Sequence, residues 1–216
     1  MRLSVNCDPA NSEWQRDLFV SLNRIGDVEL RLGNSDAALD AYRKDLTIAE
    51  ALSLRDPANA EGQRDLSISL TRIGDVELRL GNGDAALTAY RKGLAIAEAL
   101  SLRDPANTEW QRDLSISLDR IGDVELRLSN GDAALDAYRN SLAIREALSL
   151  RDPANNEWQR DLIVSNVKLA EAGDRPAERW RAALAIAEAL RGAGRLAPVD
   201  GWILDDLKRR LAEDDV

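Results

Sequence analysis

Histidine is absent from the 216 residues of the sequence, and cysteine occurs once, as Cys7. Without histidine the chain cannot form a Ser-His-Asp triad or a histidine-ligated metal site, and it lacks the commonest general acid and base near neutral pH. A single cysteine excludes an intramolecular disulfide and a cysteine-rich zinc site. We therefore expect no catalytic residue, no metal and no cofactor, and we predict that the protein is not an enzyme.

Long apolar runs are also missing. No run approaches the ~18 apolar residues of a membrane span, and no signal peptide is recognisable. Because an unpaired cysteine suits a reducing compartment, we expect a cytoplasmic protein. The formal net charge of −9 disfavours nucleic acid and anionic membrane surfaces, and it favours protein or peptide partners of basic or mixed charge.

An internal repeat dominates the sequence. The tetrapeptide Asp-Pro-Ala-Asn begins at Asp8, Asp56, Asp104 and Asp152, each 48 residues after the last. The second and third copies differ at only eight positions. Such a period indicates a repeat protein, in which each copy packs mainly on its neighbours. We predict four copies, at about 8–55, 56–103, 104–151 and 152–192.

Each copy reads as two helices joined by a short turn. In the third copy, apolar residues recur every three or four positions from Thr108 to Leu128, which predicts an amphipathic helix. Asn107 is its expected N-cap. A Ser-Asn-Gly turn breaks this helix, and a second helix from about 132 to 150 ends at the next Asp-Pro. The sequence therefore predicts an all-α chain of helical hairpins.

These hairpins resemble the tetratricopeptide repeat (TPR) family. The third copy reads Ile121-Gly122 in its first helix, Ala134-Leu135 and Tyr138 in its second, and then Asp152-Pro153. These residues match the family's Leu-Gly, Ala-Leu, aromatic and Pro positions across the turn between the helices. The copy is about 14 residues longer than the usual 34-residue unit, with about seven extra residues in each helix. Seven residues make nearly two turns, so the packing faces stay aligned.

The resemblance implies a right-handed α-solenoid of helix-turn-helix (TPR-like) repeats with long helices. We expect the repeat array to span 13–173, after an irregular segment at 1–12. The fourth copy departs from the pattern, because Ala170 replaces the glycine and Trp180 the tyrosine. We interpret 174–216 as a degenerate last helix plus a C-terminal capping helix. The apolar stripe expected in that capping helix comprises Trp202, Ile203, Leu207 and Leu211.

The first copy has no preceding repeat to cover its first helix. Its apolar stripe corresponds to the stripe that the inner copies bury against a neighbour, so we expect it to associate with a second chain as a homodimer. The expected self-association residues are Trp14, Leu18, Leu22 and Ile25.

Aspartates recur along the first helices, each followed one turn later by an arginine. One interpretation is a set of exposed i,i+4 ion pairs. The other, which the TPR resemblance implies, is that these positions line a concave groove that holds a peptide. The expected groove residues are Val20, Asn23, Asp27, Arg31, Ile68, Thr71, Asp75, Arg79, Ile116, Asp119, Asp123 and Arg127.

Three functions stay open at this point. The first is a non-enzymatic scaffold that binds a peptide or protein partner through the concave groove. The second is a structural, self-associating solenoid. The third is a regulatory subunit of a separately encoded enzyme. The aspartate–arginine pattern favours the first function, and the near-identity of the copies favours the second.

Overall fold

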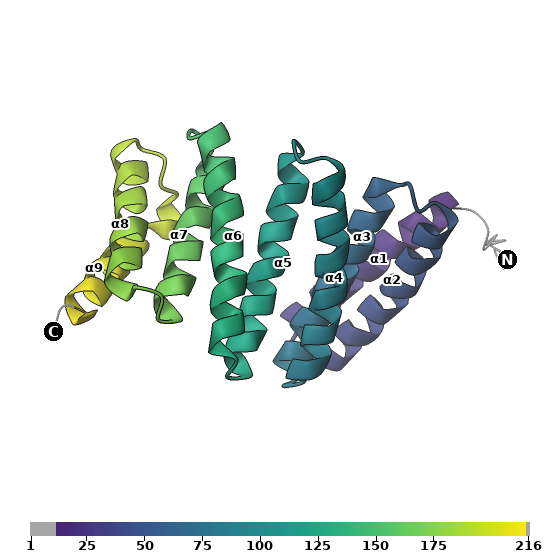
Figure 1. Ribbon diagram of the computed structural model, residues 1–216. Coiled ribbons are helices and arrows are strands. Elements are labelled where there is room, and N and C mark those ends of the chain that lie inside the picture. The colour runs from purple at the N-terminus through teal and green to yellow at the C-terminus, as the bar shows by residue number, and fades with distance from the viewer. Residues whose placement is uncertain (1–11, 215–216) are drawn as a thin grey trace, which may run out of the picture. The chain divides into compact units, whose positions relative to one another are not determined.

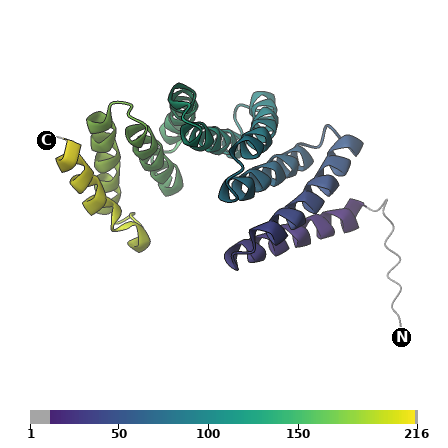
Figure 2. The ribbon, with the colours of Figure 1, turned by 90° about the horizontal axis from the view of Figure 1, so that it is seen from below.

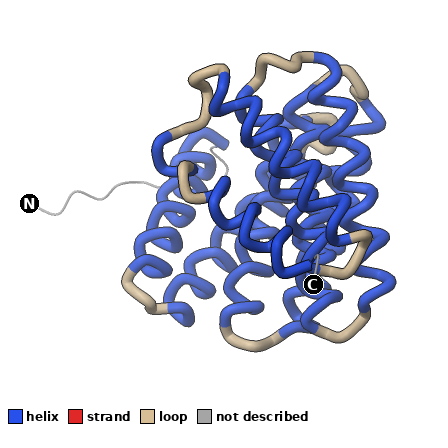
Figure 3. The backbone as a smooth tube through the Cα atoms, turned by 90° about the vertical axis from the view of Figure 1, so that its left-hand side faces the viewer, coloured by secondary structure: helices blue, strands red, loops and turns tan. Residues whose placement is uncertain are grey.

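The computed structural model describes residues 12–214 of the chain. Between Ser12 and Asp214 the backbone forms α-helices, one short 3-10 helix and loops, without a strand (Figures 1 and 3). The all-α, solenoid-like fold predicted from the sequence is confirmed. The elements are α1 (Ser12–Arg31), α2 (Ser35–Arg55), α3 (Ala60–Arg79), α4 (Gly83–Arg103), α5 (Thr108–Arg127), α6 (Gly131–Arg151), α7 (Asn156–Glu171), α8 (Pro176–Gly192), η1 (Pro198–Asp200) and α9 (Ile203–Asp214).

The chain divides into two compact units, Met1–Arg103 and Asp104–Val216. The border coincides with the end of the second copy. In unit 1, α1 packs on α2, α2 on α3 and α3 on α4 (Figure 2). In unit 2, the helices from α5 to α9 pack on one another in the same consecutive order. The irregular segment expected at 1–12 lies outside the described residues, except for Ser12, which begins α1.

Local capping fixes where the first helices start. The side-chain oxygen of Asn107 accepts hydrogen bonds from the backbone N–H groups of Glu109 and Trp110, at 3.1 Å each. Asn155 caps α7 in the same way. These bonds satisfy donors that the first turn of a helix leaves unpaired. The N-cap predicted at Asn107 is therefore confirmed.

The C-terminal helix differs from its prediction at one residue. α9 packs on α8, and Leu204 and Leu207 are buried in a core with Trp180 and Leu190. Ile203 and Leu211 pack at the edge of this core. Trp202, expected in the apolar stripe, instead lies before α9 and is 64% exposed. The helix begins one residue after Trp202, and the first side chain of α9 that is buried in this core is Leu204.

Glycine in the middle of each first helix permits a close approach between the two helices of a hairpin. A Cβ atom added at Gly122 would lie 2.5 Å from Cε1 of Tyr138, and Gly26 and Gly74 face Tyr42 and Tyr90 in the same way. The tyrosine rings are buried. A side chain at the glycine position would therefore displace a packed ring.

Gly122→Ala is expected to lower the free energy of unfolding of unit 2. Forcing a methyl group against the buried ring of Tyr138 costs about 1–3 kcal/mol, whereas alanine contributes about 1 kcal/mol of helix propensity. The matched control is Gly131→Ala, because nothing lies within 4 Å of a Cβ at that position. Urea unfolding should show a loss for Gly122→Ala alone. Equal stability of the two variants would contradict the close approach.

Candidate functional site

The aspartates of the first helices accept hydrogen bonds from buried tyrosines. The hydroxyl of Tyr42 donates to Asp27 at 2.8 Å, and the hydroxyl of Tyr138 donates to Asp123 at 2.7 Å. The second copy has the same bond between Tyr90 and Asp75, at 2.6 Å. Burial, and then the bond to Asp123, raises the pKa of Tyr138, so its hydroxyl stays a donor.

In the first and third copies, a cationic side chain from the next copy binds the aspartate and lies over the tyrosine ring. Arg72 on α3 bonds to Asp27 and stacks over the ring of Tyr42, at 5.5 Å from the ring centroid. Lys168 on α7 does the same for Asp123. The expected i,i+4 ion pairs are therefore wrong for Asp27 and Asp123. In both cases the carboxylate pairs with the cation 45 positions later in the sequence and not with the arginine one turn along its own helix.

Three of the expected groove residues already have polar partners within their own hairpins. The amide of Asn23 donates to Asp45 at 2.9 Å, and the hydroxyl of Thr71 donates to the backbone carbonyl of Ser67 at 3.0 Å. Asp119 is buried and forms an ion pair with Arg145 at 2.7 Å. Asp119 is thus not available to a ligand, because α6 supplies its buried partner.

Two of these contacts belong to buried polar clusters that join successive copies. Asp45 on α2 is 0% exposed and also accepts a hydrogen bond from Ser69 of the second copy, at 2.8 Å. Arg145 on α6 is 4% exposed and donates to Ser165 of the fourth copy, at 2.7 Å. Neither residue was predicted from the sequence. A usable signal was present, because the copies differ at these positions, with Gly93 in place of Asp45 and Ala97 in place of Arg145.

An open groove of about 640 Å³ lies along the C-terminal half of α1 and extends to Arg79, the last residue of α3, in unit 1. It contains Asp27, Arg31 and Arg79 from the expected set. Within residues 12–214, the guanidinium groups of Arg31 and Arg79 have no hydrogen-bond or ion-pair partner, whereas Asp27 is bound by Tyr42 and Arg72. The groove therefore offers free positive charge. Its full lining is Arg24, Asp27, Val28, Leu30, Arg31 and Arg79.

The remaining expected groove residues lie elsewhere. Val20 is exposed on α1, and Ile68 and Asp75 are partly buried on α3, but none of them lines this groove. Ile116, Asp123 and Arg127 belong to α5 in unit 2.

Two smaller hollows repeat at the 48-residue period. One lies beside α4, with Ile96 and Ala99 in its lining, and encloses about 320 Å³. The other lies beside α6, with Ile144 and Ala147, and encloses about 350 Å³. An arginine edges each hollow, but Arg151 already donates to the backbone carbonyls of the loop before α5. These hollows are apolar and offer less polar recognition than the groove.

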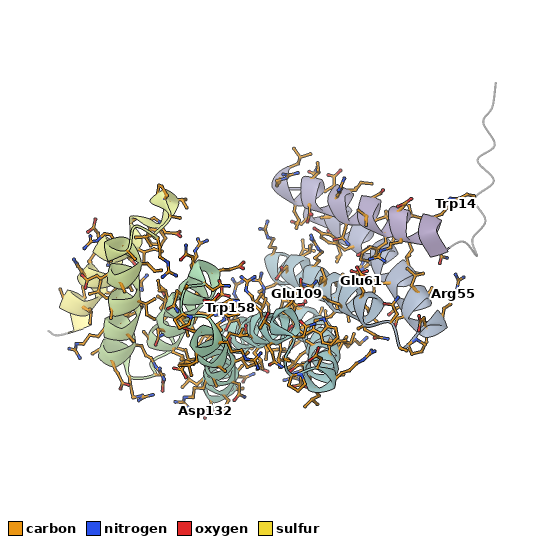
Figure 4. All side chains as sticks on the ribbon, turned by 90° about the horizontal axis from the view of Figure 1, so that it is seen from above. Trp14, Arg55, Glu61, Glu109, Asp132 and Trp158 are labelled. Atoms are coloured by element: carbon orange, nitrogen blue, oxygen red, sulfur yellow. The ribbon has the colours of Figure 1, made fainter. Side chains whose placement is uncertain are left out.

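The outer face of α1 is exposed in the part of the chain that the structure describes. Trp14, Leu18 and Ile25 are exposed, and Leu22 is partly buried at the edge of the same face. α1 lies at the edge of unit 1, with Trp14 near its N-terminal end (Figure 4). Three of the four residues expected to mediate self-association are thus on the surface.

In the described part of the chain, no helix is both long and apolar enough to cross a membrane. No family model and no curated protein matches the sequence. Among solved structures, the chain is similar to BtubC (BKLC) from P. vanneervenii, with a TM-score of 0.57 and 15% identity over 91% of this chain and 81% of that one. It also matches MamA, with a TM-score of 0.39 and 17% identity over 87% of this chain and 91% of that one. The likeness to BtubC shows a shared helical-repeat fold.

Proposed function

We propose that the chain is a non-enzymatic scaffold of TPR-like repeats that binds a peptide or protein partner in the groove between α1 and α3. The observation that carries this proposal is the pair of free arginines. Arg31 and Arg79 occupy the same position in successive copies and border one open groove. An extended ligand can contact equivalent positions in both copies, as solenoid surfaces allow.

The groove favours an acidic ligand, in contrast to the basic partner expected from the sequence. The pattern of aspartates suggested a negative surface, but the carboxylate of Asp27 already binds Arg72. Arg24, Arg31 and Arg79 remain, and guanidinium groups bind carboxylates in a bidentate geometry. The net charge of −9 acts on a ligand mostly from a distance, and salt screens charges that are more than ~8 Å apart. The net charge therefore opposes an acidic ligand less than the nearby arginines attract it. A partner with acidic side chains between apolar residues fits both Val28 and the arginines.

The other two functions follow from the same surfaces. A regulatory subunit is the same binding activity with an enzyme as the partner. Self-association uses the bare face of α1. The lone Cys7 favours a reducing, cytoplasmic setting for either activity.

Two short fluorescent peptides test the groove. Both carry leucines at the same positions, with glutamates between them in one peptide and lysines in the other. Fluorescence polarisation should show binding of the glutamate peptide. Arg31→Ala with Arg79→Ala should weaken that binding at least ~10-fold, because hydrogen bonds to charged groups contribute about 1.5–3 kcal/mol each.

The control for this experiment is Lys44→Ala with Lys92→Ala. These lysines are exposed on α2 and α4, so the control changes the net charge equally but leaves the groove intact. Tighter binding of the lysine peptide would contradict the acidic ligand and would support the basic partner expected from the sequence. Binding that ignores the loss of Arg31 and Arg79 would contradict the groove.

A further inference from the structure

A regular apolar seam runs along the outer side of α1. Its positions alternate between four and three residues apart, which is the spacing of a helix that packs lengthwise against another helix. Apart from one serine, its members are large apolar residues that the structure leaves exposed, with Leu18 at 51% and Ile25 at 50%. We call this the α1 seam; it consists of Trp14, Leu18, Ser21, Ile25, Val28 and Leu32.

The second copy shows what this seam does when a neighbour is present. Ile73 and Val76 on α3 correspond to Ile25 and Val28, and they pack in a core with residues of α2. Ile73 is 8% exposed there. The α1 seam therefore has the sequence of a helix–helix interface, and no other helix among residues 12–214 covers it.

We propose that the α1 seam pairs with the α1 seam of a second copy, the two helices running antiparallel about a two-fold axis. With the axis midway between Ser21 and Ile25, the small serine lies opposite the partner's Ile25. By the same symmetry, Leu18 lies opposite the partner's Val28, and Trp14 lies opposite the partner's Leu32. In each layer a larger side chain of one helix then lies opposite a smaller side chain of the other, as interdigitated packing requires.

Charges beside the seam favour the antiparallel orientation. Asp17 and Arg31 lie on the same flank of α1, and each side chain lacks a polar partner among the described residues. An antiparallel pair places Asp17 near the partner's Arg31, and the two-fold axis creates this contact twice. On the other flank, Leu22 meets the partner's Leu22 near the axis, which accounts for its place at the edge of the bare face.

A parallel pair fits less well. It would set Ser21 against the partner's Ser21 in the middle of the seam and Asp17 beside the partner's Leu22. Its one opposite-charge contact would join Arg24 to the partner's Glu29, but Glu29 already accepts a hydrogen bond from Asn34 at 2.8 Å. The antiparallel pair has one unfavourable contact, between Arg24 and the partner's Arg24, and both side chains are long and can turn into water.

The size of the seam sets the strength of association. Two helices of 20 residues packed along their length form an interface at the lower end of the range of specific complexes, about 1,200 Å². We therefore expect a reversible dimer with a micromolar dissociation constant. Val28 of the seam and Arg31 on its flank also line the groove, so dimer formation and occupation of the groove compete.

Sedimentation equilibrium of the full chain from low to high micromolar concentration tests the dimer. Wild type should pass from monomer to dimer, and Leu18→Glu should raise the dissociation constant at least ~10-fold, because each dimer would bury two unpaired carboxylates. Val20→Glu is the matched control, since Val20 is 40% exposed on the same helix but lies off the seam. Circular dichroism should show that both variants keep their helices.

A charge exchange tests the orientation. Asp17→Arg should weaken the dimer, and adding Arg31→Asp should restore it, because the pair re-forms with its signs reversed. Failure of the double variant to recover association would overturn the antiparallel arrangement. A protein that stays monomeric throughout, or that loses association equally in Leu18→Glu and Val20→Glu, would overturn the seam as a self-association surface. Neither Leu18 nor Asp17 lines the groove, whereas Arg31 does, so Leu18→Glu distinguishes a failure of the dimer from a failure of peptide binding.

Discussion

Arg145→Ala is expected to lower the free energy of unfolding of unit 2 by about 3–5 kcal/mol, because it leaves a buried carboxylate without its cation. Arg145 forms an ion pair with Asp119 at 2.7 Å, and both side chains are buried. Burial raises the pKa of Asp119, and the charge of Arg145 opposes this rise. Removing the guanidinium therefore exposes the full cost of the buried charge.

The second copy supplies the rescue. It carries Thr71 and Ala97 at the positions of Asp119 and Arg145, within an otherwise almost identical hairpin. Adding Asp119→Thr to Arg145→Ala should recover most of the lost stability. The double variant has an uncharged threonine and alanine at these positions, so no buried carboxylate is left without a cation. Urea unfolding followed by tryptophan fluorescence reports on unit 2, since four of the five tryptophans lie after residue 103. A double variant as unstable as Arg145→Ala would contradict the coupling.

Asp45→Asn is expected to stabilise unit 1 at neutral and alkaline pH. Burial, only partly opposed by hydrogen bonds from Ser69 and Asn23, raises the pKa of Asp45 from 3.8 to about 6. Arg72 lowers this pKa and Asp65 raises it, both from α3. One oxygen of the carboxylate has no hydrogen-bond partner. An asparagine keeps the size of the side chain and removes its charge.

The pH dependence has a definite sign. The folded state holds the proton of Asp45 up to about pH 6, whereas the unfolded chain loses it near pH 4. The stability contributed by this group is therefore greatest below about pH 4, falls as the pH rises to about 6, and stays low above that. The loss is about 3 kcal/mol at most.

Urea unfolding between pH 4 and 8, followed by far-ultraviolet circular dichroism, measures this effect. Asp45→Asn should flatten the profile, and Asp40→Asn, which changes an exposed carboxylate on the same helix, should leave it unchanged. A wild-type profile that matches that of Asp45→Asn throughout would contradict the buried, protonated aspartate.

The helices were predictable because their signals are local. The expected helix from Thr108 to Leu128 is α5, Thr108–Arg127, and its boundary follows from the cap at Asn107 and the three-and-four spacing of apolar residues. The apolar face of α1 was predictable for a related reason, since the inner copies repeat the same stripe in a buried setting.

The partners of the charged residues were not predictable from spacing along one helix. Asp27 has Arg31 one turn away, but packing brings Arg72 and Tyr42 to its carboxylate. Arg145 meets Asp119 across the hairpin and Ser165 on the next copy, which depends on how the helices pack. The border after Arg103 also had no sequence signal, because the copies on its two sides are nearly identical.

Hydrogen–deuterium exchange with the glutamate peptide tests the scaffold function most directly. On binding, the backbone amides of 24–31 and those next to Arg79 should exchange more slowly, because the peptide covers the groove residues of α1 and the end of α3. Amides of α2 and α4 should keep their exchange rates. Protection confined to α2 and α4, or a bound peptide that protects neither groove segment, would contradict the groove between α1 and α3 as the binding site.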